Sequence, residues 1–254
     1  MKNKIAIVTG VSRLKGIGRA ICLELAKKGT DIYFTYWLGY DNQMPWGVNE
    51  SEPVTIQKEL IALGVNCEKI ELDLSKVESI AVLFNDVESK LGNPSILVNN
   101  ATYSTYTDIQ TITSEEIDRH YEINIRATTL LAIEFIRRFQ GESGGRIINL
   151  SSGQSLSRMS NEIAYAITKG AIETLTYTLQ HETAEKGITI NAVNPGPTDS
   201  GWMNDTMKAE LLKRFPMKRI GLPNDAARLI SFLASEESEW ITGQIIHSDG
   251  GFKN

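Results

Sequence analysis

The sequence predicts an α/β protein with a doubly wound sheet, and three observations lead to this prediction. Short apolar runs alternate with segments of helical periodicity along nearly all of the 254 residues. Glycine stands where helices should end, as Gly29 does after the first helical segment. Small, polar or turn-forming residues follow most of the apolar runs, at the edge where such sheets bind ligands. A chain of this length can bury a large core as one unit, so we expect a single domain over residues 1–254.

The elements follow one another in regular β-α order. The first strand is expected at residues 5–8, and a helix over 17–28 places Ile17, Ile21 and Leu25 on one face. Further strands are expected at residues 31–37, 66–74, 95–101, 146–152, 188–195 and 243–251. Further helices are expected at residues 53–64, 75–91, 113–139, 161–186 and 223–235. The apolar strands therefore predict a seven-stranded, mostly parallel sheet covered by helices on both faces.

Composition argues against several classes of function. The formal net charge of -5, with acidic residues dispersed along the chain, gives no general attraction to nucleic acid. The first apolar run is too short for a signal sequence or a membrane span, so we expect a cytoplasmic protein without membrane contact. Cys22, Cys67 and three scattered histidines lack the spacing of metal ligands, so we expect no metal.

A glycine-rich loop lies between the first strand and the first helix. Gly10, Gly16 and Gly18 have the order of a turn that holds phosphate at a helix N-terminus, although the pattern G-x-G-x-x-G is absent. Arg13 and Lys15 add two cations to this loop. The sequence therefore predicts a nucleotide phosphate site here.

The fifth expected helix carries the residues best suited to acid–base chemistry. Tyr165 and Lys169 are four residues apart, on one helix face, where an ammonium group lowers the pKa of a phenol. Such a phenol can exchange a proton with a carbonyl or alcohol oxygen. A chance surface pair is the competing interpretation, but Ser152 ends a strand thirteen residues before the tyrosine and Asn124 lies in the preceding long helix.

Taken together, these motifs resemble the short-chain dehydrogenase/reductase family over essentially the whole chain. The resemblance implies a Rossmann fold and an NAD(P)-dependent oxidoreductase that acts on CH–OH groups, assembled as a homotetramer. The matching elements, in the order and spacing of the family, are Thr9-Gly10, Gly16-Ile17-Gly18, Asn99-Asn100-Ala101, Asn124, Ser152, Tyr165-x-x-x-Lys169, Pro195-Gly196 and Asp249-Gly250-Gly251.

The resemblance also implies a role for each member of the catalytic set. Tyr165 is the acid and base, and Lys169 lowers the pKa of Tyr165 and hydrogen-bonds the nicotinamide ribose. Ser152 hydrogen-bonds the substrate oxygen; its neighbour Ser151 is the alternative, but the spacing to Tyr165 favours Ser152. Asn124 holds a water molecule in a proton relay behind the lysine.

The same resemblance implies the cofactor and its contacts. Arg13 and Lys15 suit the 2′-phosphate of NADP, and the second strand ends at Tyr36 where NAD-preferring relatives have an acid; the next carboxylate is Asp41. NADP(H) is therefore the preferred cofactor, with NAD(H) as the alternative. The remaining contacts expected with the cofactor are Gly10, Ser12, Gly16, Ile17, Gly18, Asp73, Leu74, Asn100, Ala101, Tyr165, Lys169, Pro195, Gly196, Thr198 and Ser200.

The chain departs from the family pattern in three places. Five residues lie between Gly10 and Gly16, where the family usually has three, and Thr102 replaces a usual glycine. Residues 38–52 are longer than the expected connection and should cover the adenosine end of the cofactor or contact a neighbouring subunit. Residues 197–222 resemble the mobile substrate loop of the family. The apolar residues expected as its lid are Trp202, Met203, Met207 and Phe215, and for Met207 and Phe215 a packed helix is the alternative.

The expected reaction is NADPH-dependent reduction of a carbonyl to an alcohol, or the reverse, on a small molecule or a 3-oxoacyl thioester. Arg137, Arg138 and Lys186 are the candidates for docking an acidic carrier protein. A general alcohol or sugar dehydrogenase is the alternative, and a nonenzymatic dinucleotide sensor is a weaker one. An enoyl reductase is disfavoured because its lysine would stand at the position of Ile172.

Overall fold

The computed structural model describes residues 1 and 3–253, and its centre is a parallel sheet of seven strands in the order β3-β2-β1-β4-β5-β6-β7. Every strand pair in it is parallel, which confirms the predicted doubly wound class. The order reverses between β1 and β4, and ligands bind at such a switch point. The strands are β1 Ile5–Val8, β2 Asp31–Tyr36, β3 Cys67–Glu71, β4 Ile96–Asn99, β5 Gly145–Leu150, β6 Ile188–Asn194 and β7 Ile245–His247.

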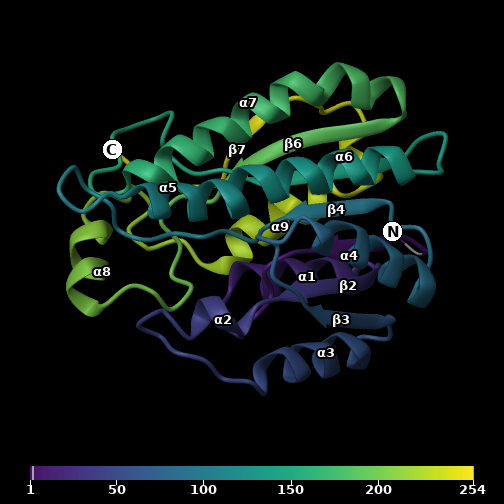
Figure 1. The fold of residues 1–254 in the computed structure, drawn as a ribbon, viewed down its shortest axis with the longest axis horizontal. Coiled ribbons are helices and arrows are strands. Elements are labelled where there is room, and N and C mark those ends of the chain that lie inside the picture. Colours follow the sequence, from purple (N-terminus) through teal and green to yellow (C-terminus); the bar gives the residue numbers. More distant parts are fainter. Residues whose placement is uncertain (2, 254) are drawn as a thin grey trace.

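Helices cover both faces of the sheet (Figure 1). Alternate residues of β1 face opposite ways: Val8 packs in the core beneath α1, α3 and α9, and Ile7 packs in the core beneath α4, α6 and α7. Apolar residues on both faces of one strand explain why the strands are apolar runs rather than alternating patterns. The helices are α1 Ile17–Lys27, α3 Glu52–Ala62, α4 Glu78–Lys90, α6 Thr128–Arg138, α7 Ile163–Glu185 and α9 Pro223–Leu233.

The long helix expected over residues 113–139 is interrupted by a π-helical segment. It consists of α5 (Ser114–His120), the π-helix η1 (Tyr121–Ala127) and α6. The Thr113 side chain caps α5 by accepting a hydrogen bond from the Glu116 amide. Such widened turns occur mostly at functional sites, and this one carries Asn124.

Two short helices lie in the two longest connections of the chain, and a helix was one of our two expectations around Met207, within the second. The first is α2 (Leu38–Asp41), within the long connection after β2, and the second is α8 (Asp205–Leu212), within the expected substrate loop. A bridge between Thr198 and Gly221 closes the base of that loop. The substrate segment is therefore an ordered helical excursion, with α2 and α8 on the same side of the molecule in Figure 1. One further 3-10 turn, η2 (Glu236–Ser238), precedes β7.

Candidate active site

A cavity of about 1080 Å³ opens at the carboxyl ends of the strands, between α2 and the segment that contains α8. Lys15, Asn124 and Lys169, which the sequence also predicts at the site, lie outside its wall. The wall includes these predicted site residues: Gly10, Ser12, Arg13, Gly16, Ile17, Gly18, Tyr36, Asp73, Leu74, Asn100, Ala101, Ser152, Tyr165, Pro195, Gly196, Thr198 and Ser200.

The glycine loop leaves the start of α1 open to the cavity. Gly10 has a φ of +72°, and a Cβ there would lie 2.6 Å from the Cα of Ala101. A Cβ on Gly18 would lie 2.8 Å from the Asn100 side chain. Within the described chain, no side chain caps α1 at Gly16, so its first amides remain available to an anion. This turn fits the diphosphate of a dinucleotide.

Asn100 fastens the end of β4 to the end of β1. Its side-chain nitrogen donates to the carbonyls of Thr9, at 2.8 Å, and Gly10, at 2.9 Å. The Thr9 hydroxyl accepts hydrogen bonds from the amides of Asn100 and Ala101. Asn100 thus shapes the switch point, and Thr9, which our sequence-based prediction of the site omitted, completes the arrangement.

Asp73 both lines the cavity and makes a turn. Its carboxylate accepts a hydrogen bond of 2.9 Å from the Ser75 amide, and its carbonyl accepts one from the Ser79 hydroxyl. These bonds fix the chain between β3 and α4, as Asx turns do. The fold therefore holds this wall of the cavity rigidly.

At the other end of the cavity, Tyr165 lies between Ser152 and Lys169. The Lys169 ammonium is 5.4 Å from the centre of the Tyr165 ring and donates a 2.8 Å hydrogen bond to the carbonyl of Leu150. Ser152 lines the cavity with Tyr165 and lowers the pKa of the Tyr165 phenol, and the Ser152 hydroxyl also donates to the Met159 sulfur at 3.9 Å. Ser151, the alternative to Ser152, donates its hydroxyl to Glu173 at 2.9 Å. The geometry thus favours Ser152 as the serine that faces the reaction centre.

The pKa of Tyr165 differs from the sequence-based expectation. Burial raises this pKa well above the ordinary value for tyrosine, the Glu162 carboxylate raises it further, and Ser152 opposes the shift. Burial lowers the pKa of Lys169 to about 8. Lys169 is not among the groups that shift the pKa of Tyr165 in this structure; its buried ammonium donates to the Leu150 carbonyl. A neutral phenol is the form that donates a proton to a carbonyl oxygen.

Asn124 is held by four hydrogen bonds. Its oxygen accepts from the Thr102 hydroxyl, at 3.0 Å, and the Tyr103 amide, at 2.8 Å. Its nitrogen donates to the Tyr103 carbonyl and to the Thr168 hydroxyl, at 2.9 and 3.0 Å. Thr102, the residue in place of a usual glycine, thus helps to join the π-helix to the loop after β4, and Thr168 joins it to α7.

At the adenosine end of the cavity, the two longer segments contact each other. The guanidinium of Arg13 lies 4.2 Å from the centre of the Trp46 ring, and its Nε is 3.5 Å from an Asp41 oxygen. The indole of Trp46 donates to the same oxygen at 2.8 Å. The lengthened glycine loop is also bound through the Leu14 amide, which donates to the Glu52 carboxylate at 2.6 Å. Part of the segment 38–52 thus lines the cavity. Whether it covers the adenosine of the cofactor or contacts a neighbouring subunit stays a prediction.

Lys15 and the substrate segment meet outside the cavity wall. The aliphatic stem of Lys15 lies against Gly201. Trp202 lines the cavity and donates its indole N–H to the carbonyl of Thr198 at 2.9 Å. Met203 and Phe215 are buried. Of the apolar residues predicted as a lid, Trp202 therefore faces the cavity, while Met203 and Phe215 anchor the segment.

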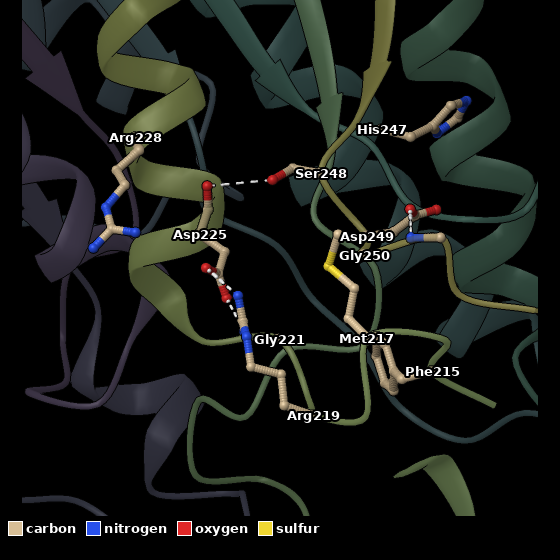
Figure 2. A pocket seen from close by; sticks show the side chains of 11 residues that line it. Phe215, Met217, Arg219, Gly221, Asp225, Arg228, His247, Ser248, Asp249 and Gly250 are labelled. Atoms are coloured by element: carbon tan, nitrogen blue, oxygen red, sulfur yellow. Dashed lines mark hydrogen bonds and ion pairs between the residues drawn. The ribbon is translucent and has the colours of Figure 1, made fainter. Parts of the chain in front are cut away.

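A second cavity, of about 390 Å³, lies beside β7 (Figure 2). Arg219 and Asp225 face each other in it and form two hydrogen bonds of 2.6 and 2.9 Å. Asp225 also accepts from the Leu222 amide at the start of α9. Arg219 and Asp225 thus satisfy each other's hydrogen-bonding groups. Their main effect is to hold the end of the segment 197–222 against the start of α9.

Comparison with known proteins agrees with this geometry. The family described as "Enoyl-(Acyl carrier protein) reductase" matches residues 10–253. The "Uncharacterized oxidoreductase YjdA" of Bacillus subtilis is 48% identical over 253 residues, which are 99% of this chain and 97% of that protein. The "3-oxoacyl-[acyl-carrier-protein] reductase FabG" of Staphylococcus epidermidis is 32% identical over 252 residues, 98% of each chain.

A solved structure extends the likeness to three dimensions. The landomycin C-6 ketoreductase LanV, with bound NADP and rabelomycin, superposes with a TM-score of 0.84 at 28% identity, covering 98% of this chain and 96% of that one. Across the described residues of our chain, no helix is both long and apolar enough to span a membrane. The chain therefore belongs to the short-chain dehydrogenase/reductase family of NAD(P)-dependent oxidoreductases.

Proposed function

We propose that this protein reduces a ketone or aldehyde to an alcohol with NADPH. The observation that carries the proposal is the position of Tyr165, with Ser152 beside it and Lys169 behind it, at the end of a cavity whose other end has an open helix N-terminus. The NADP bound to the related ketoreductase LanV supports the choice of cofactor. So does Arg13, a cation in the cavity wall beside Asp41 and Trp46.

In this proposal the chain's own residues bind the cofactor and supply the proton. The amides after Gly16 hold the diphosphate, and Arg13 binds the 2′-phosphate. The bound cofactor supplies a hydride to the carbonyl carbon. Tyr165 donates its proton to the carbonyl oxygen, which becomes the hydroxyl of the product, and Ser152 donates a hydrogen bond to the same oxygen. The proton that Tyr165 loses is replaced from water, so one carbonyl, one NADPH and one proton give one alcohol and one NADP⁺.

A free carbonyl compound is the preferred substrate in this proposal. Arg137, Arg138 and Lys186, the predicted docking residues for a carrier protein, lie where α6 and α7 end, next to the starts of β5 and β6 and away from the cavity. Arg138 is already paired with Glu134 and Glu88. The 3-oxoacyl thioester reductase is the second candidate, supported by the Staphylococcus relative. The Tyr165–Lys169 spacing argues against enoyl reduction, although the matching family is described by that activity.

We also propose that residues 1–254 act as one NAD(P)-binding domain, with residues 197–222 as the substrate segment, in a cytoplasmic homotetramer. Exposed apolar side chains on α7, Ile167 and Tyr177, support pairing of the long helices between subunits. Ile117 and Tyr121, on α5 and η1, are exposed in the same way.

The test is NADPH oxidation by the purified protein with small ketones and with an acetoacetyl thioester. Replacing Tyr165 by Phe should lower turnover by about 10²–10⁴-fold, the usual contribution of a general acid. NADPH binding, followed by cofactor fluorescence, should stay unchanged. A Tyr165→Phe variant that keeps more than about a tenth of the wild-type rate is incompatible with this role. Turnover confined to the thioester would select the second candidate.

A further inference from the structure

Glu162 is an acidic residue in the wall of the active-site cavity that the proposed reaction does not use. It is the residue just before α7 and lies one helical turn before Tyr165. Both residues line the same cavity, and the Glu162 carboxylate raises the pKa of the Tyr165 phenol, so the two side chains lie near each other in its wall.

The backbone around Glu162 is clamped in place. The Thr107 amide donates to the Asn161 carbonyl at 2.8 Å, and the Thr107 carbonyl accepts from the Ile163 amide at 3.1 Å. The Thr107 hydroxyl accepts from the Ala164 amide at 3.2 Å. Asn161 has a φ of 62°, a left-handed conformation that asparagine adopts more readily than most residues. The position of Glu162 is thus fixed by the fold before any substrate arrives.

The carboxylate itself has no partner within the described part of the chain: neither a hydrogen bond nor an ion pair holds it. Three arginines in the cavity wall bind other groups: Arg13 binds Asp41, Arg119 binds Glu116 and Arg214 binds the Lys253 carbonyl. The fourth, Arg158, makes no hydrogen bond or ion pair with the described chain, Glu162 included. Burial raises the pKa of Glu162, and no neighbouring cation or donor opposes that shift. A partly buried carboxylate in the cavity wall without a donor from the chain itself is available to accept a hydrogen bond from a bound molecule.

We propose that Glu162 is a substrate-binding residue that accepts a hydrogen bond from a hydroxyl group next to the carbonyl of the substrate. The substrate class is then the hydroxyketones and hydroxyaldehydes. This inference rests on the proposed function, because it places the hydroxyl relative to the carbonyl that Tyr165 protonates. An unsubstituted acyl chain would leave the carboxylate unpaired, so the same residue disfavours 3-oxoacyl thioesters.

The test compares hydroxyacetone with butanone, two ketones of nearly equal shape that differ by a hydroxyl in place of a methyl group. The readout is the ratio of their kcat/KM values in the wild type and in Glu162→Gln and Glu162→Leu. We expect the ratio, in favour of hydroxyacetone, to fall about tenfold in the Gln variant and further in the Leu variant, while butanone turnover is retained. Any change that the variants cause in the pKa of Tyr165 affects both ketones alike and cancels in the ratio.

Glu122→Gln is the matched control. Glu122 also lines the cavity, but its carboxylate is paired with Arg126 at 3.2 Å, so this variant should leave the ratio unchanged. A ratio that stays constant in both Glu162 variants, or that falls equally in Glu122→Gln, overturns the proposal.

A binding measurement separates this proposal from the proposed function. In the Tyr165→Phe variant loaded with NADPH, quenching of the cofactor fluorescence reports the Kd of each ketone without turnover. A Kd for hydroxyacetone at least about tenfold below that for butanone, lost in Tyr165→Phe/Glu162→Leu, supports the hydroxyl site even if the wild type oxidises no NADPH with either ketone. Equal Kd values refute the hydroxyl site even if both ketones are reduced.

Discussion

The two ends of the active-site cavity are built in different ways. At the catalytic end, Tyr165, Lys169 and Ser152 are positioned by regular elements, α7 and the end of β5, and their spacing along the chain follows from that geometry. At the adenosine end, Arg13 is positioned by Asp41 and Trp46, which come from the irregular segment after β2. The comparison teaches that the proposed catalytic residues lie on or next to regular elements, whereas the proposed contact of Arg13 with the cofactor depends on loop contacts.

The largest effect should come from the catalytic end. Replacing Lys169 by Met removes the group proposed to hydrogen-bond the nicotinamide ribose beside Tyr165, and we expect NADPH-dependent ketone reduction to fall about 10²-fold, at the low end of the range for acid–base groups. Steady-state kinetics with NADPH and a small ketone measure this. A loss below threefold would show that Lys169 contributes little to ketone reduction, despite its position beside Tyr165.

Lys169→Met should also change how the free energy of unfolding depends on pH. Burial lowers the pKa of Lys169 from 10.5 to about 8, so between these values the unfolded chain binds the proton and the folded chain does not. The free energy of unfolding of the wild type should therefore rise with pH across this window relative to Lys169→Met. Denaturant titrations at pH 7 and pH 9.5 compare the two proteins; a constant difference would contradict the burial of a charged lysine.

A smaller effect is expected at the adenosine end. Replacing Arg13 by Gln should raise the KM for NADPH about 10–100-fold and leave the KM for NADH nearly unchanged, because only NADPH carries the 2′-phosphate. Lys15→Gln is the comparison, since the Lys15 stem lies against Gly201 outside the cavity wall, and we expect less than about a threefold change. Equal losses with both cofactors would assign Arg13 a merely structural role.

The smallest effect should come from the contact that joins the two longer segments. Replacing Glu52 by Gln weakens its hydrogen bond to the Leu14 amide, and we expect a loss of about 1 kcal/mol in the free energy of unfolding, or about 2–4 °C in Tm. Glu50→Gln is the control, because Glu50 is exposed. Thermal unfolding that shows the same Tm for both variants would mean that the two segments are held independently.

The fold was largely predictable because helical periodicity and apolar strands are local signals. The substrate segment was harder: α8 is a helix with no buried residues, so no apolar stripe marks it in the sequence. The π-helix at Asn124 continues an apolar helical pattern and leaves no local signal either. At the site, Tyr165 and Lys169 have a recognisable spacing, whereas Thr9, Thr102 and Asp41 act through contacts with residues far along the chain, which a single sequence does not reveal.

The hydrogen bond between Leu14 and Glu52 has a consequence for protein engineering. The lengthened glycine loop and the long connection after β2 are separate insertions in the sequence, yet each supplies a contact that the other needs: Glu52 binds the Leu14 amide, and Trp46 stacks on Arg13. If only one of them were transferred to a relative with short loops, the Leu14 amide would lose its acceptor, Glu52, or the Trp46 indole would lose its contact with Arg13. The two segments should therefore be transferred to another protein, or deleted, only together.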